Sequence, residues 1–201
     1  MNYGNSFQRS TPVVTNLIII NALVWVAQLL LDKTFNLTDK IALIPYKYDN
    51  FEPYQLVTHM FAHGSWMHII FNMLALWSFG TMLERVWGHK RFLIFYLACG
   101  LAAGVAHLLL ENVPAVGASG AIMGLFAAFA YLFPNTQLVI FPLPIPIKAK
   151  YAVGIMAAID LFGGVYPVLG GNVAHFAHLG GLAMGFILVL IWNKTNKKTF
   201  Y

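Results

Sequence analysis

Charged residues are scarce in this chain. Asp, Glu, Lys and Arg make up 9% of its 201 residues, whereas hydrophobic residues make up 59%. So few charges cannot cover the water-facing surface of a soluble domain of this length. The composition therefore excludes an ordinary soluble enzyme and predicts an integral membrane protein.

Cysteine pairs and clustered positive charge are also missing. The single cysteine, Cys99, lies inside an apolar run, so the chain has no internal disulfide framework. The net charge of +5 comes from basic residues scattered between apolar runs and at the C-terminus. A nucleic-acid-binding protein would gather them on one stripe. We therefore expect the lipid bilayer, and no nucleic acid, as a partner.

Long apolar runs take the place of charge. Several approach the roughly 20 residues that a helix needs to cross a hydrocarbon core about 30 Å thick. The first run is longer than a signal-peptide core and lacks a small-residue cleavage pattern, so we expect a retained helix. Hydropathy predicts six membrane helices, at about residues 13–31, 66–83, 92–110, 119–133, 149–162 and 175–193.

These helices predict an all-α fold with one transmembrane domain, residues 13–193. An N-terminal segment, residues 1–12, precedes this domain, and a tail, residues 194–201, follows it. The first loop, of roughly 30 residues, is too long for a simple connector. We expect it to form a structured cap that is partly embedded in the membrane.

The basic residues predict the orientation. Six crossings place both termini on one side, together with the segments 84–91 and 134–150. That side carries nine basic residues: Arg9, Arg85, Lys90, Arg91, Lys148, Lys150, Lys194, Lys197 and Lys198. The opposite side carries only Lys33, Lys40 and Lys47. Because cytoplasmic loops are enriched in Lys and Arg, both termini are expected in the cytoplasm.

Four polar side chains are predicted to lie at one depth. Ser119 lies 14 residues before Phe133, and His178 lies 14 residues before Trp192. With a rise of about 1.5 Å per residue, both lie about 21 Å above the inner boundary of the membrane. The same counting places Asn72 and His68 at about 18 and 24 Å, on one face of the second helix.

Small residues favour contact between the fourth and sixth helices. Gly120 and Gly124 form one small-xxx-small pair, and Gly181 and Gly185 form another. Such pairs let two helix backbones approach closely in a membrane. This contact would bring Ser119 to His178.

The pattern around Ser119 suggests nucleophilic catalysis. The fourth helix is too short to cross the membrane, so residues 112–118 must dip below the surface, where protein or water must surround them. A serine in the first turn of a helix lies beside free backbone N–H groups that can bind an oxyanion. A positioned imidazole such as His178 can accept its proton. Alone, Ser119 would more simply bond its own backbone, and Ala121 breaks the Gly-x-Ser-x-Gly pattern of soluble hydrolases.

Two alternatives concern the other polar residues. Five histidines are predicted toward the outer side and could bind zinc: His59, His63, His68, His175 and His178. The His-Glu-x-x-His pattern is absent, however, and we expect no metal site. Asp160, near the outer end of the fifth helix, either orients His178 or is a structural aspartate. We favour the structural role, because sequence does not give its distance from His178.

These motifs resemble those of the rhomboid family of intramembrane serine proteases, from about Leu17 to Trp192. The family pattern His-x-x-x-x-His-x-x-x-Asn is present as His63, His68 and Asn72. The sequences Gly-Ala-Ser-Gly at 117–120 and Ala-His-Leu-Gly-Gly-Leu-Ala-Met-Gly at 177–185 match the nucleophile and base motifs, and Glu84 and Gly88 fit the end of the second helix.

The resemblance implies a bundle of six helices with a short central fourth helix. Ser119 and His178 would form a catalytic dyad without an acidic member. His68, Asn72 and the Ser119 amide would form the oxyanion hole, with a backbone contribution from Gly117. The fifth helix and the loop 163–173 would admit transmembrane protein substrates. No cofactor is implied, and the protein would lie in a bacterial-type cell (inner) membrane.

Two departures limit this resemblance. Some relatives have Trp-Arg where this chain has Tyr54-Gln55, and a tyrosine where it has Met123. The first departure concerns lipid contacts of the first loop, and the second concerns the orientation of the catalytic histidine. His63 either contacts substrate or supports the loop. A silent relative that binds without cutting and a small transporter or channel are the rival functions.

Overall fold

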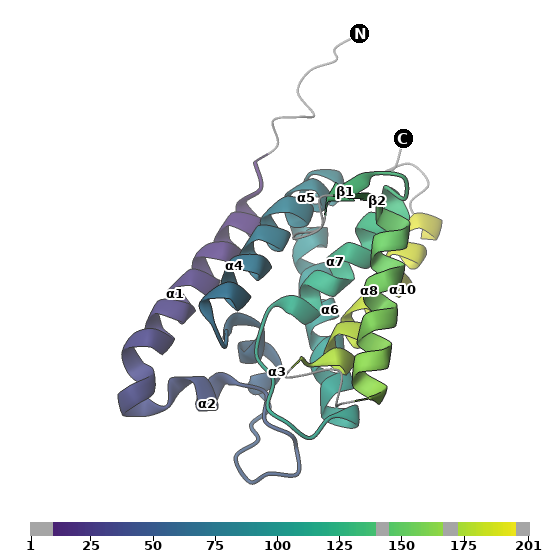
Figure 1. Ribbon diagram of the computed structural model, residues 1–201. Coiled ribbons are helices and arrows are strands. Elements are labelled where there is room, and N and C mark those ends of the chain that lie inside the picture. Colours follow the sequence, from purple (N-terminus) through teal and green to yellow (C-terminus); the bar gives the residue numbers. More distant parts are fainter. Residues whose placement is uncertain (1–9, 140–144, 167–172, 196–201) are drawn as a thin grey trace.

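A computed structural model describes residues 10–139, 145–166 and 173–195. It is a helical bundle in which the start of α1 and the end of α10 lie at one end, together with a short hairpin (Figure 1). The loop that contains α2 and α3 lies at the opposite end. The expectation of an all-α fold is confirmed.

The helices that form the bundle lie over the six predicted ranges. They are α1 (Pro12–Phe35), a continuous helix built from α4 (Trp66–Ala75), a π-helical turn (Leu76–Gly80) and α5 (Thr81–Trp87), then α6 (His89–Leu110), α7 (Ser119–Leu132), α8 (Ala149–Val165) and α10 (His175–Thr195). Within the described residues, four of them are long and apolar enough to cross a membrane: Pro12–Phe35, Trp66–Trp87, His89–Leu110 and His175–Asn193. The protein is therefore a multi-pass membrane protein.

Local signals set the ends of these helices. Pro12 occupies the first turn of α1, where its missing N–H is no loss, and Asn36 ends that helix in the left-handed conformation. Ser65 caps α4 by accepting a hydrogen bond from the His68 amide. At the other end of the same continuous helix, in α5, the Glu84 carboxylate accepts hydrogen bonds from the amides of Val13 and Val14. Glu84 thus joins the second membrane helix to the start of the first.

The first loop is structured, and so is the segment before Ser119. The loop contains α2 (Leu37–Ile41), α3 (Gln55–Thr58) and a 3-10 turn (His59–Phe61). Leu43 and Ala115 exchange backbone hydrogen bonds of 2.9 and 3.0 Å, so the loop pairs with the segment before α7. The irregular backbone of residues 112–118 is therefore surrounded by protein where it pairs with the loop.

A hairpin between α7 and α8 was not predicted. Strands β1 (Gln137–Val139) and β2 (Pro146–Lys148) are antiparallel and have three residues each. Strands this short leave no alternating hydrophobic pattern that the sequence could reveal. The hairpin fixes the spacing between α7 and α8 at the end of the bundle where α1 begins (Figure 1).

The core of the bundle lies around α6 and α7. The largest fully buried aromatic side chains are Tyr96, Phe92 and Phe95 on α6 and Phe129 on α7. On α7, nine of 14 residues are buried, in keeping with the predicted central helix. By contrast, α1 and α8 expose large apolar residues such as Leu30 and Ile159, as expected for surfaces that face lipid.

Candidate active site

Ser119 is the first residue of α7. The first hydrogen bond of this helix runs from the Ile122 amide to the Ala118 carbonyl, at 3.1 Å. The amides of the residues between them therefore precede the helical hydrogen-bond ladder. Backbone donors of this kind beside a nucleophile can stabilise an oxyanion.

Gly117 shapes the turn into this helix. Its φ of +127° lies in a region that L side chains rarely adopt, and its amide donates to the His59 carbonyl at 2.8 Å. A Cβ at this position would lie 2.7 Å from Nε2 and Cε1 of His68 and 3.6 Å from Oγ of Ser119. Glycine is therefore required for His68 to approach the serine.

His178 lies in the first turn of α10, and its Nε2 is 2.9 Å from Oγ of Ser119. The prediction that both residues lie at one depth agrees with this distance. The helix contact inferred from the glycine pairs is also present. A Cβ at Gly181 would collide with the Gly120 carbonyl, and a Cβ at Gly185 would lie 2.5 Å from the Gly124 carbonyl oxygen.

Asp160 of α8 contacts two histidines of α10. Its Oδ1 lies 3.0 Å from Nδ1 of His178 and 2.8 Å from Nδ1 of His175. Sequence reasoning favoured a structural aspartate beside a Ser-His pair without an acid. In the structure, Asp160, His178 and Ser119 lie in one hydrogen-bonded row. The signal for this contact was that Asp160 is an acid inside an apolar segment.

Glu111, at the end of α6, was not singled out by sequence reasoning. Its carboxylate accepts a hydrogen bond of 2.8 Å from the Phe176 amide, and its other oxygen lies 3.3 Å from Nδ1 of His107. A carboxylate at a helix N-terminus satisfies a free amide and complements the helix dipole. Glu111 therefore fixes the start of the helix that carries His178.

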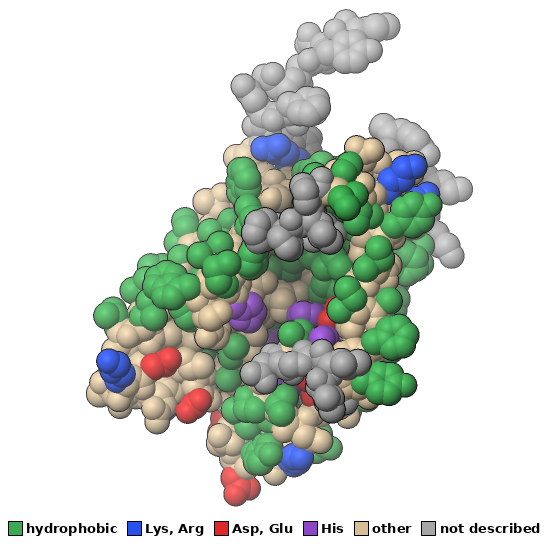
Figure 2. All heavy atoms as spheres, in the orientation of Figure 1, with side chains coloured by type: hydrophobic (Ala, Val, Ile, Leu, Met, Phe, Trp, Pro, Cys, Tyr) green, Lys and Arg blue, Asp and Glu red, His purple; other side chains and the backbone are tan. Residues whose placement is uncertain are grey.

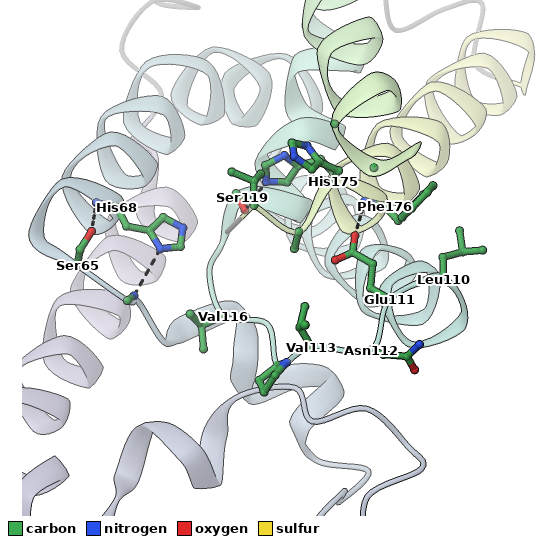
Figure 3. A pocket seen from close by; sticks show the side chains of 17 residues that line it. Ser65, His68, Leu110, Glu111, Asn112, Val113, Val116, Ser119, His175 and Phe176 are labelled. Atoms are coloured by element: carbon green, nitrogen blue, oxygen red, sulfur yellow. Dashed lines mark hydrogen bonds between the residues drawn. The ribbon is translucent and has the colours of Figure 1, made fainter. Parts of the chain in front are cut away.

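His68 reaches the site from α4, on the opposite wall from Ser119 (Figure 3). Its Nδ1 accepts a hydrogen bond of 3.4 Å from the Gly64 amide. A ring nitrogen that accepts carries no proton, so in the neutral ring Nε2 carries it. That edge of the ring borders Gly117 and Ser119, where it can donate a hydrogen bond.

Asn72 lies one turn further along the same helix and is buried. Its Nδ2 has no hydrogen-bond partner among the described residues. A buried amide donor without a partner is costly, so this group can gain free energy from an acceptor that enters the site. Asn72 does not, however, line the cavity described next.

A cavity of about 970 Å³ lies above the Ser119–His178 pair, and Figure 2 shows histidine side chains within a hollow on this face. Its walls come from the start of α4, the segment between α6 and α7, and the facing ends of α8 and α10. Ser119, His178 and His68 all line it. A cavity this large can hold a peptide segment together with water.

His63 lies behind His68 and is 1% exposed. The two rings meet edge to face with centroids 5.0 Å apart. Gln28 of α1 accepts a hydrogen bond from the His63 amide and donates one to its carbonyl, each 3.0 Å long. Burial, followed by the proximity of His68, lowers the pKa of His63 to about 4. His63 is therefore a neutral support of the first loop and does not line the cavity.

The two departures from the family pattern have different surroundings. Tyr54 is half exposed, whereas Gln55 is buried. The Gln55 side-chain oxygen accepts hydrogen bonds from the Ile44 and Glu52 amides, so it organises the first loop from within. Met123 is buried.

The histidines do not form a metal-binding group. Among the described residues, no set of three or more His, Cys, Asp or Glu side chains has an arrangement that could hold a metal ion. His59 lies in the first loop, where its Nδ1 is 2.7 Å from the Gln55 carbonyl. Burial lowers the pKa of His59 to about 4. His89 lies next to Glu84, at the end of the bundle away from Ser119.

Comparison with known proteins identifies related chains. Residues 50–194 match the model of the Rhomboid domain. The chain is 32% identical over 139 residues to "Rhomboid protein 1, mitochondrial" of Saccharomyces cerevisiae, covering 66% of this chain and 40% of that protein. It is 35% identical over 136 residues to "Rhomboid protease GluP" of Bacillus subtilis, covering 67% of this chain and 25% of that protein.

The match to a third protein extends over nearly the whole chain. It is 31% identical over 188 residues to "Putative rhomboid protease YdcA" of Bacillus subtilis, covering 91% of this chain and 89% of that protein. The chain thus spans less than half of the first two relatives but most of the third. Because the family model covers most of the sequence and a relative of similar length matches nearly all of it, the chain belongs to the rhomboid family.

Proposed function

We propose that this protein is an intramembrane serine endopeptidase that cuts transmembrane protein substrates. The observation that carries this proposal is the 2.9 Å distance between His178 Nε2 and Ser119 Oγ at the floor of a cavity. A nucleophile within hydrogen-bond reach of a base is the arrangement that activates a serine. Names of relatives such as "Rhomboid protease GluP" agree with it.

In the proposed reaction, Oγ of Ser119 forms a bond to the carbonyl carbon of the substrate while its proton moves to Nε2 of His178. The negative oxygen that results accepts hydrogen bonds from the Ser119 amide, His68 and Asn72. The C–N bond then breaks, and His178 gives its proton to the leaving amine. Water from the cavity next attacks the acyl-enzyme, with His178 again accepting and returning a proton. No metal or cofactor takes part.

The substrate must unwind to be cut. In a helix each carbonyl is hydrogen-bonded to an amide four residues ahead, so a helical peptide bond hides the atom that Ser119 attacks. Small or helix-breaking residues near the cut site should lower the cost of unwinding. We propose entry beside α8 and the loop 163–173, of which residues 167–172 lie outside the described residues.

We further propose that the helices cross the membrane six times, with both termini in the cytoplasm of a bacterial-type cell. The nine basic residues on that side support this orientation. The site would then open toward the outer face. Because Cys99 is buried, a cysteine introduced at an exposed position can be labelled selectively. A membrane-impermeant maleimide should label Lys47→Cys, and not Lys90→Cys, on intact cells; the reverse result would contradict the orientation.

The proposed activity is tested with the purified protein in liposomes that contain a model transmembrane substrate. We expect the wild type to cut it, whereas Ser119→Ala and His178→Ala should cut at least about 10³-fold more slowly, since each removes a partner of the reacting pair. A fluorophosphonate probe should label the wild type and not Ser119→Ala. Equal cleavage by Ser119→Ala would overturn the proposal.

A further inference from the structure

Glu111 brings a carboxylate into the wall of the cavity that holds Ser119. Among the described residues that line this cavity, it is the only Asp, Glu, Lys or Arg. Its side chain is 14% exposed, so the carboxylate is largely enclosed by protein but still open to the cavity. Figure 3 shows Glu111 and His68 on opposite sides of Ser119. A substrate segment bound between Ser119 and His68 can therefore extend toward Glu111.

The surroundings of Glu111 favour its ionised form. One carboxylate oxygen accepts a hydrogen bond of 2.8 Å from the Phe176 amide, in the first turn of α10. A backbone donor and the positive end of a helix dipole both stabilise a negative charge. Glu111 is therefore a fixed negative charge in the cavity wall.

The second carboxylate oxygen of Glu111 lacks a donor when His107 is neutral. It lies 3.3 Å from Nδ1 of His107. Nε2 of the same ring is 2.7 Å from the Val113 carbonyl, which can only accept, so a neutral ring carries its proton on Nε2. Nδ1 then has no proton to give, and it has no hydrogen-bond partner among the described residues. The oxygen beside it can accept a hydrogen bond from a molecule that enters the cavity.

Apolar side chains next to Glu111 restrict what that molecule can be. Leu110 and Val113 line the same cavity and are 59% and 57% exposed. Phe176 also lines it. The side chains of lysine and arginine combine an apolar stem with a cationic head that only donates hydrogen bonds. A carboxylate with a free oxygen beside an apolar wall matches both parts of such a side chain.

We propose that Glu111 selects substrates that carry a lysine or arginine near the cut peptide bond, by pairing with the cationic head of that side chain. This inference rests on the proposed protease function. Because the carbonyl that is attacked lies between Ser119 and His68, the basic residue belongs on the side of the cut bond that extends toward the start of α10. An acidic residue at the same position is repelled, so it makes a poor substrate.

The alternative is that Glu111 only fixes the start of α10. Glu111→Gln separates the two roles, because the glutamine side-chain oxygen can still accept from the Phe176 amide while the charge is lost. Glu52→Gln is the matched control. It removes the same charge from the first loop, where Glu52 is exposed and does not line the cavity.

The experiment measures kcat/KM in liposomes at pH 8, where free histidine is neutral. Model transmembrane substrates carry lysine, methionine or glutamate at one position at a time on each side of the cut site. At one position, we expect wild type and Glu52→Gln to prefer lysine over methionine by about tenfold and to disfavour glutamate. In Glu111→Gln both ratios should fall to within about twofold of one. Each ratio is taken within one variant, so a loss of folded protein cancels.

A second measurement does not need cleavage. A carbodiimide joins a carboxylate to a lysine amine only where the two groups touch. In Ser119→Ala mixed with the preferred lysine substrate, we expect a cross-link between that lysine and Glu111, identified by mass spectrometry. Ser119→Ala that also carries Glu111→Gln should not form it.

The outcomes separate the two proposals. If wild type cuts none of the substrates, the protease function fails, and the cross-link still decides whether Glu111 binds a basic side chain. If wild type cuts but shows no preference for lysine at any position, or Glu111→Gln keeps the preference, only the role of Glu111 in selection is overturned.

Discussion

His68 and His178 approach Ser119 from opposite walls of the cavity, and their Nδ1 atoms have different partners. Nδ1 of His68 accepts from the Gly64 amide, whereas Nδ1 of His178 faces the Asp160 carboxylate. A backbone donor selects a ring with its proton on Nε2, and a carboxylate selects one with its proton on Nδ1. The two rings are thus opposite tautomers, each presenting its Nε2 to the reaction.

Because of this difference, two histidines can serve two purposes around a single serine. His178 presents a lone pair, so it can accept the Ser119 proton. His68 presents an N–H group, so it can donate to a negative oxygen but cannot act as the base. A change that removes the N–H of His68 should therefore slow the reaction without changing which residue takes the proton.

Outside the Ser119–His178 pair itself, the largest effect is expected from His68→Ala. Removing one preorganised oxyanion donor lowers kcat by about 10²- to 10³-fold while KM changes little, because the hydrogen bond forms mainly in the transition state. His68→Gln, which can still offer an N–H, should lose less. Met67→Ala, at an exposed position on the same helix, is the control for changes to α4. Equal kcat values for His68→Ala and wild type would remove His68 from the oxyanion hole.

The glycine contact that brings Ser119 to His178 offers the next test. In Gly181→Ala the added methyl group would collide with the Gly120 carbonyl, so α7 and α10 must separate. We expect a loss of about 3 kcal/mol in the free energy of unfolding, at the upper end of overpacking costs. Gly154→Ala on α8 is the matched control, because a Cβ there meets nothing within 4 Å.

The control variant should change stability in the other direction. Alanine in a helix interior is favoured over glycine by roughly 0.5–1 kcal/mol where space allows. Both variants can be compared by thermal or denaturant unfolding in the same detergent. If Gly181→Ala were as stable as Gly154→Ala, the close approach of α7 and α10 would be wrong.

Sequence predicted the Ser119–His178 pair because helix rise is nearly constant. Counting residues from each inner boundary gives depth, and small residues identify a possible contact. The Asp160 contact could not be obtained in this way. It depends on how α8 is rotated against α10, and hydropathy fixes neither the rotation nor the lateral neighbours of a helix. Gln28 was missed for the same reason, although both are polar residues in apolar helices.

A smaller effect, on the pH dependence of stability, is expected from the buried histidines of the first loop. The pKa of His63 is about 4 in the folded protein, against about 6.5 when unfolded. Between pH 4 and pH 6.5 the unfolded chain binds more protons than the folded protein. The stabilisation that comes from neutral His63 is therefore fully present above pH 6.5 and is lost as the pH falls toward 4. Each such histidine lowers the free energy of unfolding by up to about 1.4 kcal/mol per pH unit in this window.

The variant His63→Phe separates the contribution of His63 to the loss of stability at low pH from that of His59. Phenylalanine keeps a planar ring against His68 and cannot be protonated, so the loss of stability between pH 6.5 and pH 5 should shrink by up to about 2 kcal/mol. His59, whose pKa is lowered similarly, accounts for part of the remainder. Unfolding midpoints measured at both pH values test this. An unchanged difference would mean that His63 is charged, or exposed to water, in the folded protein.

The smallest effect is expected from removing metal ions. The contacts with Asp160 and Gly64 indicate that His178 and His68 act by accepting and donating protons. If they do, a chelator should leave kcat and KM unchanged within error. A zinc enzyme would instead lose activity with EDTA and regain it with zinc. Loss and recovery of this kind would overturn the metal-free mechanism proposed for Ser119 and His178. The chelator result should therefore be obtained before the kinetics of Ser119→Ala and His178→Ala are interpreted.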